Sequence, residues 1–242
     1  MEVVITHLGN MSQLIPATSV INGIKKYKEN INITWVVADD KLCCLNKYNK
    51  INRTIPLEQF IKERKFYDLL INLYPIFPEN LAINGDIRHS TGFCFSEYCD
   101  KFKSAITGEE NNFKDMSILQ LYFILCGLTW RGEGYNVGYS PKTRTKKNKI
   151  GVSVANANIR NYVLDNLKIE DKRIWYIPYK KNIFKKMDEI NKCKTIITDD
   201  LVTFHLSVFL RKYTYYLETF PLPIKLELFN NGEIYKVPMN LF

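Results

Sequence analysis

Residues 3–37 read VVITHLGNMSQLIPATSVINGIKKYKENINITWVV, and their order of apolar and polar side chains predicts the architecture. A short β-branched run, residues 3–6, is typical of a strand buried on both faces. After a polar loop, apolar residues recur at helical spacing: Leu14, Ala17, Val20, Ile21 and Ile24. Lysines at the end of this helix suit its negative dipole end, and residues 31–37 predict the next strand. The stretch therefore predicts a strand–helix–strand unit of a parallel sheet.

The same alternation continues along the first half of the chain. Further strands are predicted at residues 51–55, 67–73 and 87–93, with a helix at residues 57–64. Residues 94–112 lack periodicity and predict a long loop, alone or with a short helix. The apolar run SILQLYFILC, residues 117–126, predicts a helix that Gly127 ends.

A basic run, SPKTRTKKNK at residues 140–149, has no apolar face and predicts an exposed linker. The alternation then restarts, with strands predicted at residues 150–154, 173–177, 195–198 and 213–217. Helices are predicted at residues 159–167, 183–193 and 201–211, and the Asn231–Gly232 pair predicts a β-hairpin over residues 225–237. We therefore predict a Rossmann-like domain at residues 1–140, a linker at 141–149 and a second Rossmann-like domain at 150–242.

The composition is that of a globular protein, with 46% apolar and 24% charged residues. Six cysteines show no metal-ligand spacing, and we expect reduced core thiols rather than a set of disulfides. We expect neither a metal nor a cofactor. We recognise no signal peptide and no apolar run of about 18 residues, which predicts a cytoplasmic protein. The net charge of +9 indicates either a lysine-rich surface or an anionic partner, such as nucleotide phosphates, a phosphorylated lipid or a nucleic acid.

Two strand–loop–helix junctions are the candidate binding regions, one early in the chain at Gly9 to Gln13 and one late in it at Asp200 and Leu201. In parallel α/β sheets, ligands bind at the carboxyl ends of strands, where helix starts favour phosphate. We therefore expect two halves that face each other across a cleft, one for a donor and one for an acceptor.

The chain resembles the ADP-heptose glycosyltransferases, glycosyltransferase family 9, over most of its length. Residues 3–37 resemble that family's opening strand, R-L-G-x-x-G-D-type loop, helix and strand. KFYDLLINLYP (65–75) and IRHSTGF (87–93) resemble its Y-D-x-x-I-x-L and R-x-G-F segments, and KTIITDDLVTFHLSVFLRK (194–212) resembles its D-T-G-x-x-H-L-A segment. The resemblance implies a GT-B architecture of two Rossmann-like domains around a cleft, with the acceptor on the first and the nucleotide sugar on the second. It also implies inverting sugar transfer without a metal.

Several positions depart from the family pattern. Gln13 stands where the family has an aspartate that acts as general base, and an amide cannot take a proton at neutral pH. Ser12 replaces the second loop glycine, and Leu201–Val202 replaces the Thr–Gly pair that lets backbone N–H groups approach the diphosphate. The second half also lacks much of the family's strand and helix before RIWYIPYKKN (173–182), so we expect a shortened second domain.

The candidate site residues each have a structural alternative. Gly9 is expected beside the substrate, or is needed only for a tight turn. His7 is a candidate to donate a hydrogen bond to phosphate or to replace the missing general base; the alternative is a histidine that only packs at the end of its strand. In the second half we expect nucleotide contacts from Asn158, Arg160, Asp200, Leu201 and His205. The alternatives are a solvated helix start for Asn158 and Arg160, an N-cap for Asp200 and packing for His205.

Three functions follow from these features. The favoured one is transfer of a sugar, with heptose one candidate, from a nucleotide-diphosphate sugar to a cell-surface glycan, lipid or protein. It includes peripheral contact with the inner face of the membrane. The second is a catalytically inactive GT-B-like binding or scaffold protein, suggested by Gln13 and Leu201–Val202. The third is a basic nucleic-acid-binding protein, but the chain has no recognised nucleic-acid motif and we expect no such partner.

Overall fold

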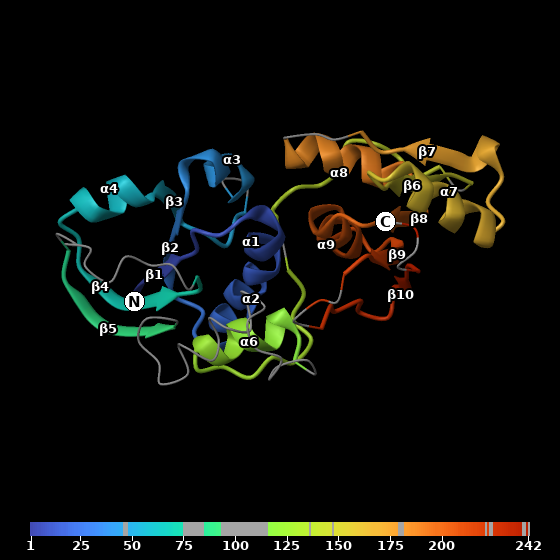
Figure 1. The fold of residues 1–242 in the computed structure, drawn as a ribbon. Helices are drawn as coiled ribbons and strands as arrows, with labels where there is room; N and C mark the ends of the chain where they lie inside the picture. Colours follow the sequence, from blue (N-terminus) through green and yellow to red (C-terminus); the bar gives the residue numbers. More distant parts are fainter. Residues whose placement is uncertain are drawn as a thin grey trace. The chain divides into compact units, whose positions relative to one another are not determined.

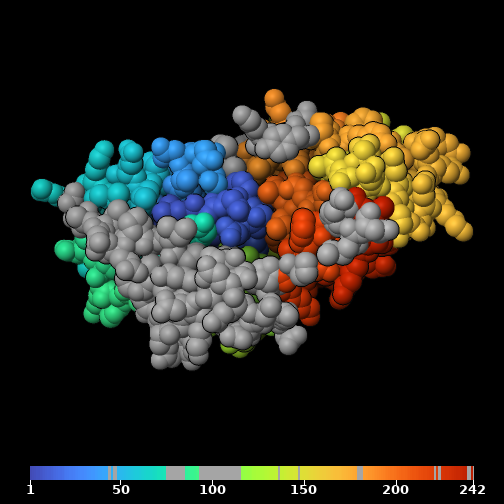
Figure 2. Space-filling view, in the orientation of Figure 1, coloured from blue at the N-terminus to red at the C-terminus, as the bar shows by residue number. Residues whose placement is uncertain are grey.

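The computed structural model describes residues 1–45, 48–74, 85–92, 116–135, 137–146, 148–178, 182–220, 222, 225–238 and 241. The chain divides into two compact units, each an α/β layered fold (Figure 1). The first unit holds Met1–Tyr139 and Pro223–Glu227, and the second holds Ser140–Leu222 and Leu228–Phe242. Residues in yellow to light orange form much of the visible surface of the second unit in the space-filling view (Figure 2).

The first unit is built on a five-stranded parallel sheet in the order β3-β2-β1-β4-β5. Its strands are β1 (Glu2–Thr6), β2 (Asn32–Val37), β3 (Arg53–Pro56), β4 (Tyr67–Asn72) and β5 (Ile87–Gly92). The chain builds outwards from β1 to β3 and then crosses to β4 on the other side. The point where the strand order reverses therefore lies between β1 and β4.

Helices cover both faces of this sheet because both faces of its strands are apolar. On one side, Val3 and Ile5 of β1 pack against α1 (Met11–Ala17), α2 (Ser19–Tyr27) and α6 (Ile118–Leu125). On the other, Val4 packs with Phe60 of α4 (Leu57–Lys62). Two short elements, η1 (Asp39–Lys41) and α3 (Leu42–Leu45), follow β2.

The second unit is also a five-stranded parallel sheet, in the order β10-β9-β8-β6-β7. Its strands are β6 (Ile150–Ser153), β7 (Ile174–Tyr176), β8 (Thr195–Thr198), β9 (Tyr213–Glu218) and β10 (Gly232–Lys236). Only one strand, β7, precedes the crossover here, whereas two do so in the first unit. The strand order reverses between β6 and β8.

The helices of the second unit also form two layers. α7 (Ala157–Asn166) packs its Ile159 and Val163 against Val152 and Ile197 of the sheet. α8 (Ile183–Asn191) and α9 (Leu201–Phe209) pack together on the opposite face, and a short 3-10 turn, η2 (Asp171–Arg173), leads into β7. Two parallel sheets with helices on both faces confirm the predicted α/β class.

Two predicted elements differ from the structure. The hairpin over residues 225–237 is wrong, because β10 pairs parallel to β9 and residues 228–231 form the turn before it. Phe229 and Asn230 have positive φ angles of 48° and 63°, which reverse the chain at this turn. The strand that follows then pairs with β9 in the parallel direction. The single helix predicted after the first loop is divided into α1 and α2 at Thr18, two residues after Pro16, which lacks a backbone N–H.

The predicted basic linker, residues 141–149, lies within the second unit and contacts α8. The Lys142 backbone N–H donates to Asp188 at 2.8 Å, and Asn191 donates to the Thr143 carbonyl at 2.6 Å. The predicted loop at residues 94–112 lies outside the described residues. No helix in the described ranges has the length and apolar character needed to cross a bilayer.

Candidate functional site

A pocket of about 520 Å³ opens at the carboxyl edge of the second sheet, where the strand order reverses. Three strand ends and two helices contribute to its lining: Val152, Ser153, Val154, Ala155, Arg160, Tyr176, Ile177, Lys186, Asp199 and Asp200. Ligands of open α/β sheets bind at this position because loops on the two sides of the reversal diverge and leave a crevice. We refer to it as the switch-point pocket.

Arg160, on the first turns of α7, is the cation that the sequence predicted for this region and it lines the pocket. Its guanidinium carbon lies 5.4 Å from the ring centroid of Tyr176, at the end of β7. Its Nε is buried and donates no hydrogen bond within the described part of the chain. The ring contact with Tyr176 orients the guanidinium, whose remaining N–H groups also have no acceptor among the described residues and have the geometry to bind a carboxylate or phosphate at two points.

Asp200 also lines the pocket, but the protein itself uses most of its hydrogen-bonding capacity. Its carboxylate caps α9 by accepting from the backbone N–H groups of Val202 at 3.3 Å and Thr203 at 3.0 Å. It also accepts from the Thr203 hydroxyl and from the Lys186 ammonium, the latter at 2.6 Å. Asp200 is therefore an N-cap, the alternative that the sequence left open, and it is also half of an ion pair.

The two neighbouring carboxylates differ in acidity. Burial alone would raise the pKa of Asp200, but hydrogen bonds from Lys186 and Thr203 hold that pKa below its usual value. Burial raises the pKa of Asp199, and the negative charge of Asp200 raises it further. The pocket therefore carries an ionised Asp200 paired to Lys186, an Asp199 that ionises less readily, and the positive charge of Arg160.

The other predicted residues of the second unit lie outside the described lining of the pocket. The Asn158 backbone N–H donates to the Asn156 side chain, which caps α7, and the Asn158 side chain is exposed. Leu201 is the first residue of α9 and is half-buried. His205 is 4% exposed and its ring packs against Phe204 at 5.1 Å, and burial lowers its pKa to about 3.

In the first unit, the predicted residues gather where β1 leads into α1. The Asn10 side chain caps α1 by accepting from the Gln13 backbone N–H at 3.3 Å, and it accepts from the Ser12 hydroxyl at 2.6 Å. A Cβ on Gly9 would lie 2.5 Å from the Tyr74 ring and 2.6 Å from Gln13 Oε1. Gly9 is thus required because Tyr74, which follows β4, packs directly on the backbone there.

His7 directly follows β1, and its side chain is fully buried. Its Nε2 lies 3.2 Å from the Tyr122 hydroxyl, and its ring lies 5.4 Å from that of Tyr74. Burial lowers its pKa to about 3, and the nearby positive charge of Lys41 acts in the same direction. In this conformation His7 is a neutral packed side chain with no surface that a substrate could contact.

The solved structures that share this fold include three bacterial glycosyltransferases. E. coli heptosyltransferase WaaC, solved with ADP, matches 99% of this chain and 94% of its own at a TM-score of 0.67 and 11% identity. For the E. coli ADP-heptose lps heptosyltransferase II, the match covers 99% of this chain and 91% of the other, with a TM-score of 0.67 and 11% identity. For a family 9 glycosyl transferase from Veillonella parvula, it covers 98% of this chain and 86% of the other, with a TM-score of 0.63 and 14% identity. The chain has the fold of the family 9 glycosyltransferases. No protein-family model matches it, and no curated protein matches its sequence.

In this glycosyltransferase fold, each group of predicted residues lies at the carboxyl edge of its own sheet. Gly9, Ser12 and Gln13 follow β1, whereas Arg160 and Asp200 follow β6 and β8. The expectation that the two edges line one cleft concerns the placement of the units and stays a prediction. The roles of the individual residues in catalysis or binding stay predictions as well.

Lys186 is the site residue that the sequence analysis missed. It lies on the buried face of α8 together with Ile183, Met187 and Ile190. The sequence did contain a signal, because this lysine falls at the helical spacing of three apolar residues and so on the buried face of the helix. A buried ammonium needs an acceptor, which indicates a nearby carboxylate or other polar group. Its ion pair with Asp200 provides that acceptor. Over the described ranges, no group of three or more His, Cys, Asp or Glu residues could hold a metal ion.

Proposed function

We propose that the protein is a glycosyltransferase that binds the diphosphate of a nucleotide sugar in the switch-point pocket of its second unit. The observation that carries this proposal is the Arg160 guanidinium at the strand reversal of the second sheet, which packs on Tyr176 and whose buried Nε has no partner among the described residues. The fold supports it, because the matching WaaC structures were solved with ADP and with ADP-2-deoxy-2-fluoro heptose. The cavity of about 520 Å³ lies within the range of small-molecule sites.

The diphosphate would be held mainly by side-chain cations. The N–H groups of Asn158 and Ile159 at the start of α7 are already taken by the Asn156 side chain, and those at the start of α9 are taken by Asp200. These helix starts therefore have fewer free donors for phosphate than an uncapped start would have. Arg160 supplies two-point hydrogen bonding, and Lys186 supplies a second positive charge once a phosphate competes with Asp200 for it.

Sugar transfer requires both a leaving group and a proton acceptor. The acceptor hydroxyl oxygen bonds to the anomeric carbon, the bond from that carbon to the diphosphate breaks, and the nucleotide diphosphate leaves with the electron pair. Arg160 and Lys186 would stabilise the negative charge that develops on the leaving group. The hydroxyl proton needs a base, and neither the Gln13 amide nor the buried His7, with its pKa of about 3, suits that role. We therefore expect slow turnover.

Calorimetry with ADP, ADP-sugars and other nucleotide sugars tests the proposal. The wild type should bind at least one of them, and R160Q should bind it roughly 10- to 100-fold more weakly, since a charge-assisted hydrogen bond is worth about 1.5–3 kcal/mol. R211Q is the matched control, because Arg211 is exposed beyond the end of α9, at the opposite edge of the sheet. Absence of binding, or equal losses in R160Q and R211Q, would contradict the proposal.

A second candidate function is nucleotide binding without turnover. Gln13 in place of a carboxylate, and the engagement of Asp200 by α9 and Lys186, favour it. Release of free ADP from a bound ADP-sugar, in the presence of glycan, lipid or protein acceptor fractions, separates the two functions. Measurable acceptor-dependent release by the wild type would exclude the non-catalytic alternative, and binding without release would support it.

Charge distribution supports an anionic surface as a further partner of the second unit. Of the 34 lysines and arginines and 25 aspartates and glutamates, the second unit holds 18 and nine, which leaves 16 of each in the first unit. The whole net charge of +9 is therefore carried by the second unit. We propose peripheral contact with an anionic membrane surface, which attracts clustered basic residues. Sedimentation with vesicles that contain anionic lipid should carry the protein down at low salt, and equal sedimentation with neutral vesicles would refute this contact.

A further inference from the structure

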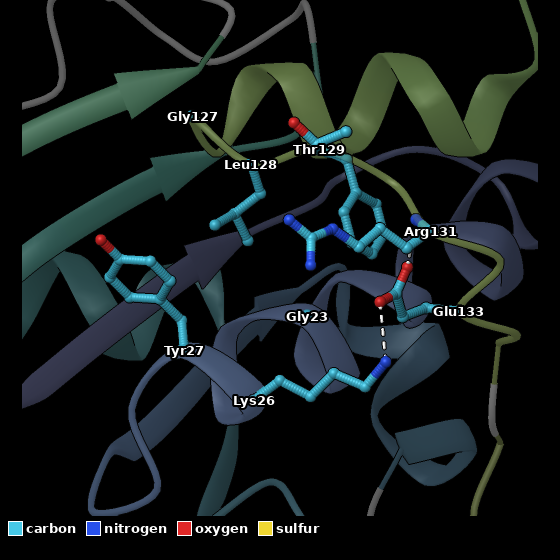
Figure 3. Close-up of a pocket in the computed structure, with 9 residues that line it drawn as sticks. Gly23, Lys26, Tyr27, Gly127, Leu128, Thr129, Arg131 and Glu133 are labelled. Carbon is cyan, nitrogen blue, oxygen red and sulfur yellow. Dashed lines mark hydrogen bonds and ion pairs between the residues drawn. The ribbon is translucent and has the colours of Figure 1, made fainter.

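A second hollow lies at the opposite edge of the first sheet from Gly9 and Gln13. It has a volume of about 320 Å³ and is formed between the last turn of α2 and the segment that follows α6 (Figure 3). Because α2 leads into β2, its last turn lies at the amino edge of the sheet. None of the residues that we assign to sugar transfer lines this hollow, which we call the α2–α6 pocket.

Glu133 holds the α2–α6 pocket in shape. Its side chain is 5% exposed, and its carboxylate accepts from the Lys26 ammonium at 2.9 Å and from the Arg131 backbone N–H at 2.6 Å. The Trp130 indole donates to the Glu133 carbonyl at 2.9 Å, which closes the loop. Gly23 completes the floor, since a Cβ there would lie 2.5 Å from the Phe123 ring. The pocket is therefore built by a fixed loop rather than by a loose surface segment.

Among the described residues that line it, the α2–α6 pocket combines one cation that lacks an ion-pair partner with an apolar wall. The Arg131 side chain extends into the hollow (Figure 3), and its guanidinium has no acceptor among the residues that the structure describes. Lys26 and Glu133 neutralise each other, so the pocket keeps the single charge of Arg131. The wall consists of Leu128 and of the Tyr27 ring, which is 86% exposed and thus available to a ligand.

We propose that the α2–α6 pocket binds a small carboxylate with an aromatic or aliphatic body. The carboxylate accepts two hydrogen bonds from the Arg131 guanidinium, a geometry that arginine favours. The body of the ligand covers Tyr27 and Leu128 and removes apolar surface from water. The positive charge of Arg131 balances one negative charge on the ligand, and the partly negative carbonyl ends of α2 and α6, which border the pocket, disfavour a second one.

Ligand-observed NMR titration with benzoate tests this site. Acetate, which lacks the apolar body, and benzyl alcohol, which lacks the charge, should each bind at least tenfold more weakly than benzoate. R131Q should weaken benzoate binding roughly 10- to 100-fold through loss of charge-assisted hydrogen bonds. The matched control K28Q, an exposed lysine just beyond α2, should bind benzoate like the wild type.

The nucleotide site is independent of this one, and R160Q distinguishes them. R160Q should bind benzoate with unchanged affinity even though it binds nucleotide roughly 10- to 100-fold more weakly. Wild-type affinity in R131Q, comparable binding of benzyl alcohol, or loss of benzoate binding in R160Q would each overturn the proposal.

Discussion

The two partners of the Lys186–Asp200 ion pair differ in burial, so removing one charge or the other, in K186M or D200N, should change the free energy of unfolding by different amounts. Asparagine caps a helix about as well as aspartate, so D200N should keep the α9 cap and remove only the charge. The Lys186 side chain is 5% exposed and the Asp200 side chain is 38% exposed, so the loss of the opposite charge destabilises the buried ammonium more than it would the carboxylate. We expect D200N to lower the free energy of unfolding by about 3 kcal/mol, the lower end of the range for a broken buried pair.

K186M should lower the free energy of unfolding by only about 1 kcal/mol, because Asp200 keeps its hydrogen bonds from Val202 and Thr203 and is partly solvated. Urea denaturation followed by circular dichroism measures both variants, and K186M/D200N completes a double-mutant cycle. The double variant should be more stable than D200N alone, since its buried ammonium is gone. A K186M loss equal to or larger than that of D200N would refute this account of the site.

Three further outcomes follow from the geometry. G9A should lose about 1–3 kcal/mol of stability by overpacking against Tyr74, whereas G134A, with no atom within 4 Å of its new Cβ, should stay near wild type in urea denaturation. His7 and His205 have pKa values of about 3, below the unfolded value, so their stability contribution is present above pH 6.5 and falls as pH drops towards 3. H205Q should therefore make the free energy of unfolding fall less steeply with pH on the acid side, by up to about 1.4 kcal/mol per pH unit, and a slope equal to that of the wild type would contradict this reasoning. Q13D should raise the rate of acceptor-dependent ADP release by about 10²-fold, and an unchanged rate would show that the departure at Gln13 does not limit turnover.

The sequence predicted the sheets well because their strands are buried on both faces. Residues 3–6, 31–37 and 195–198 are short β-branched runs, and the corresponding strands lie at the centre of each sheet or next to it. Such strands need no information beyond their own composition to be recognised.

The prediction of a C-terminal hairpin failed for the opposite reason. Asn231–Gly232 is a strong local turn signal, but the partner of β10 is set by the free edge that β9 offers. Parallel pairing at that edge depends on residues outside the turn, so the local pattern could not reveal it.

The candidate site was predicted in part. Position after a strand was enough to bring Arg160 and Asp200 to one pocket, since carboxyl ends of parallel strands meet at one edge. The burial of His7 depends on Tyr74 and Tyr122, which come from distant parts of the sequence. The sequence pattern of the first loop alone could not distinguish a packed histidine from a catalytic one.

A crystal structure of the protein soaked with ADP would test the nucleotide assignment most directly. We predict that the diphosphate lies against the Arg160 guanidinium, within hydrogen-bond distance of Lys186, at the carboxyl ends of β6 and β8. Nucleotide density at any other place, or an empty switch-point pocket at saturating ADP, would contradict the account.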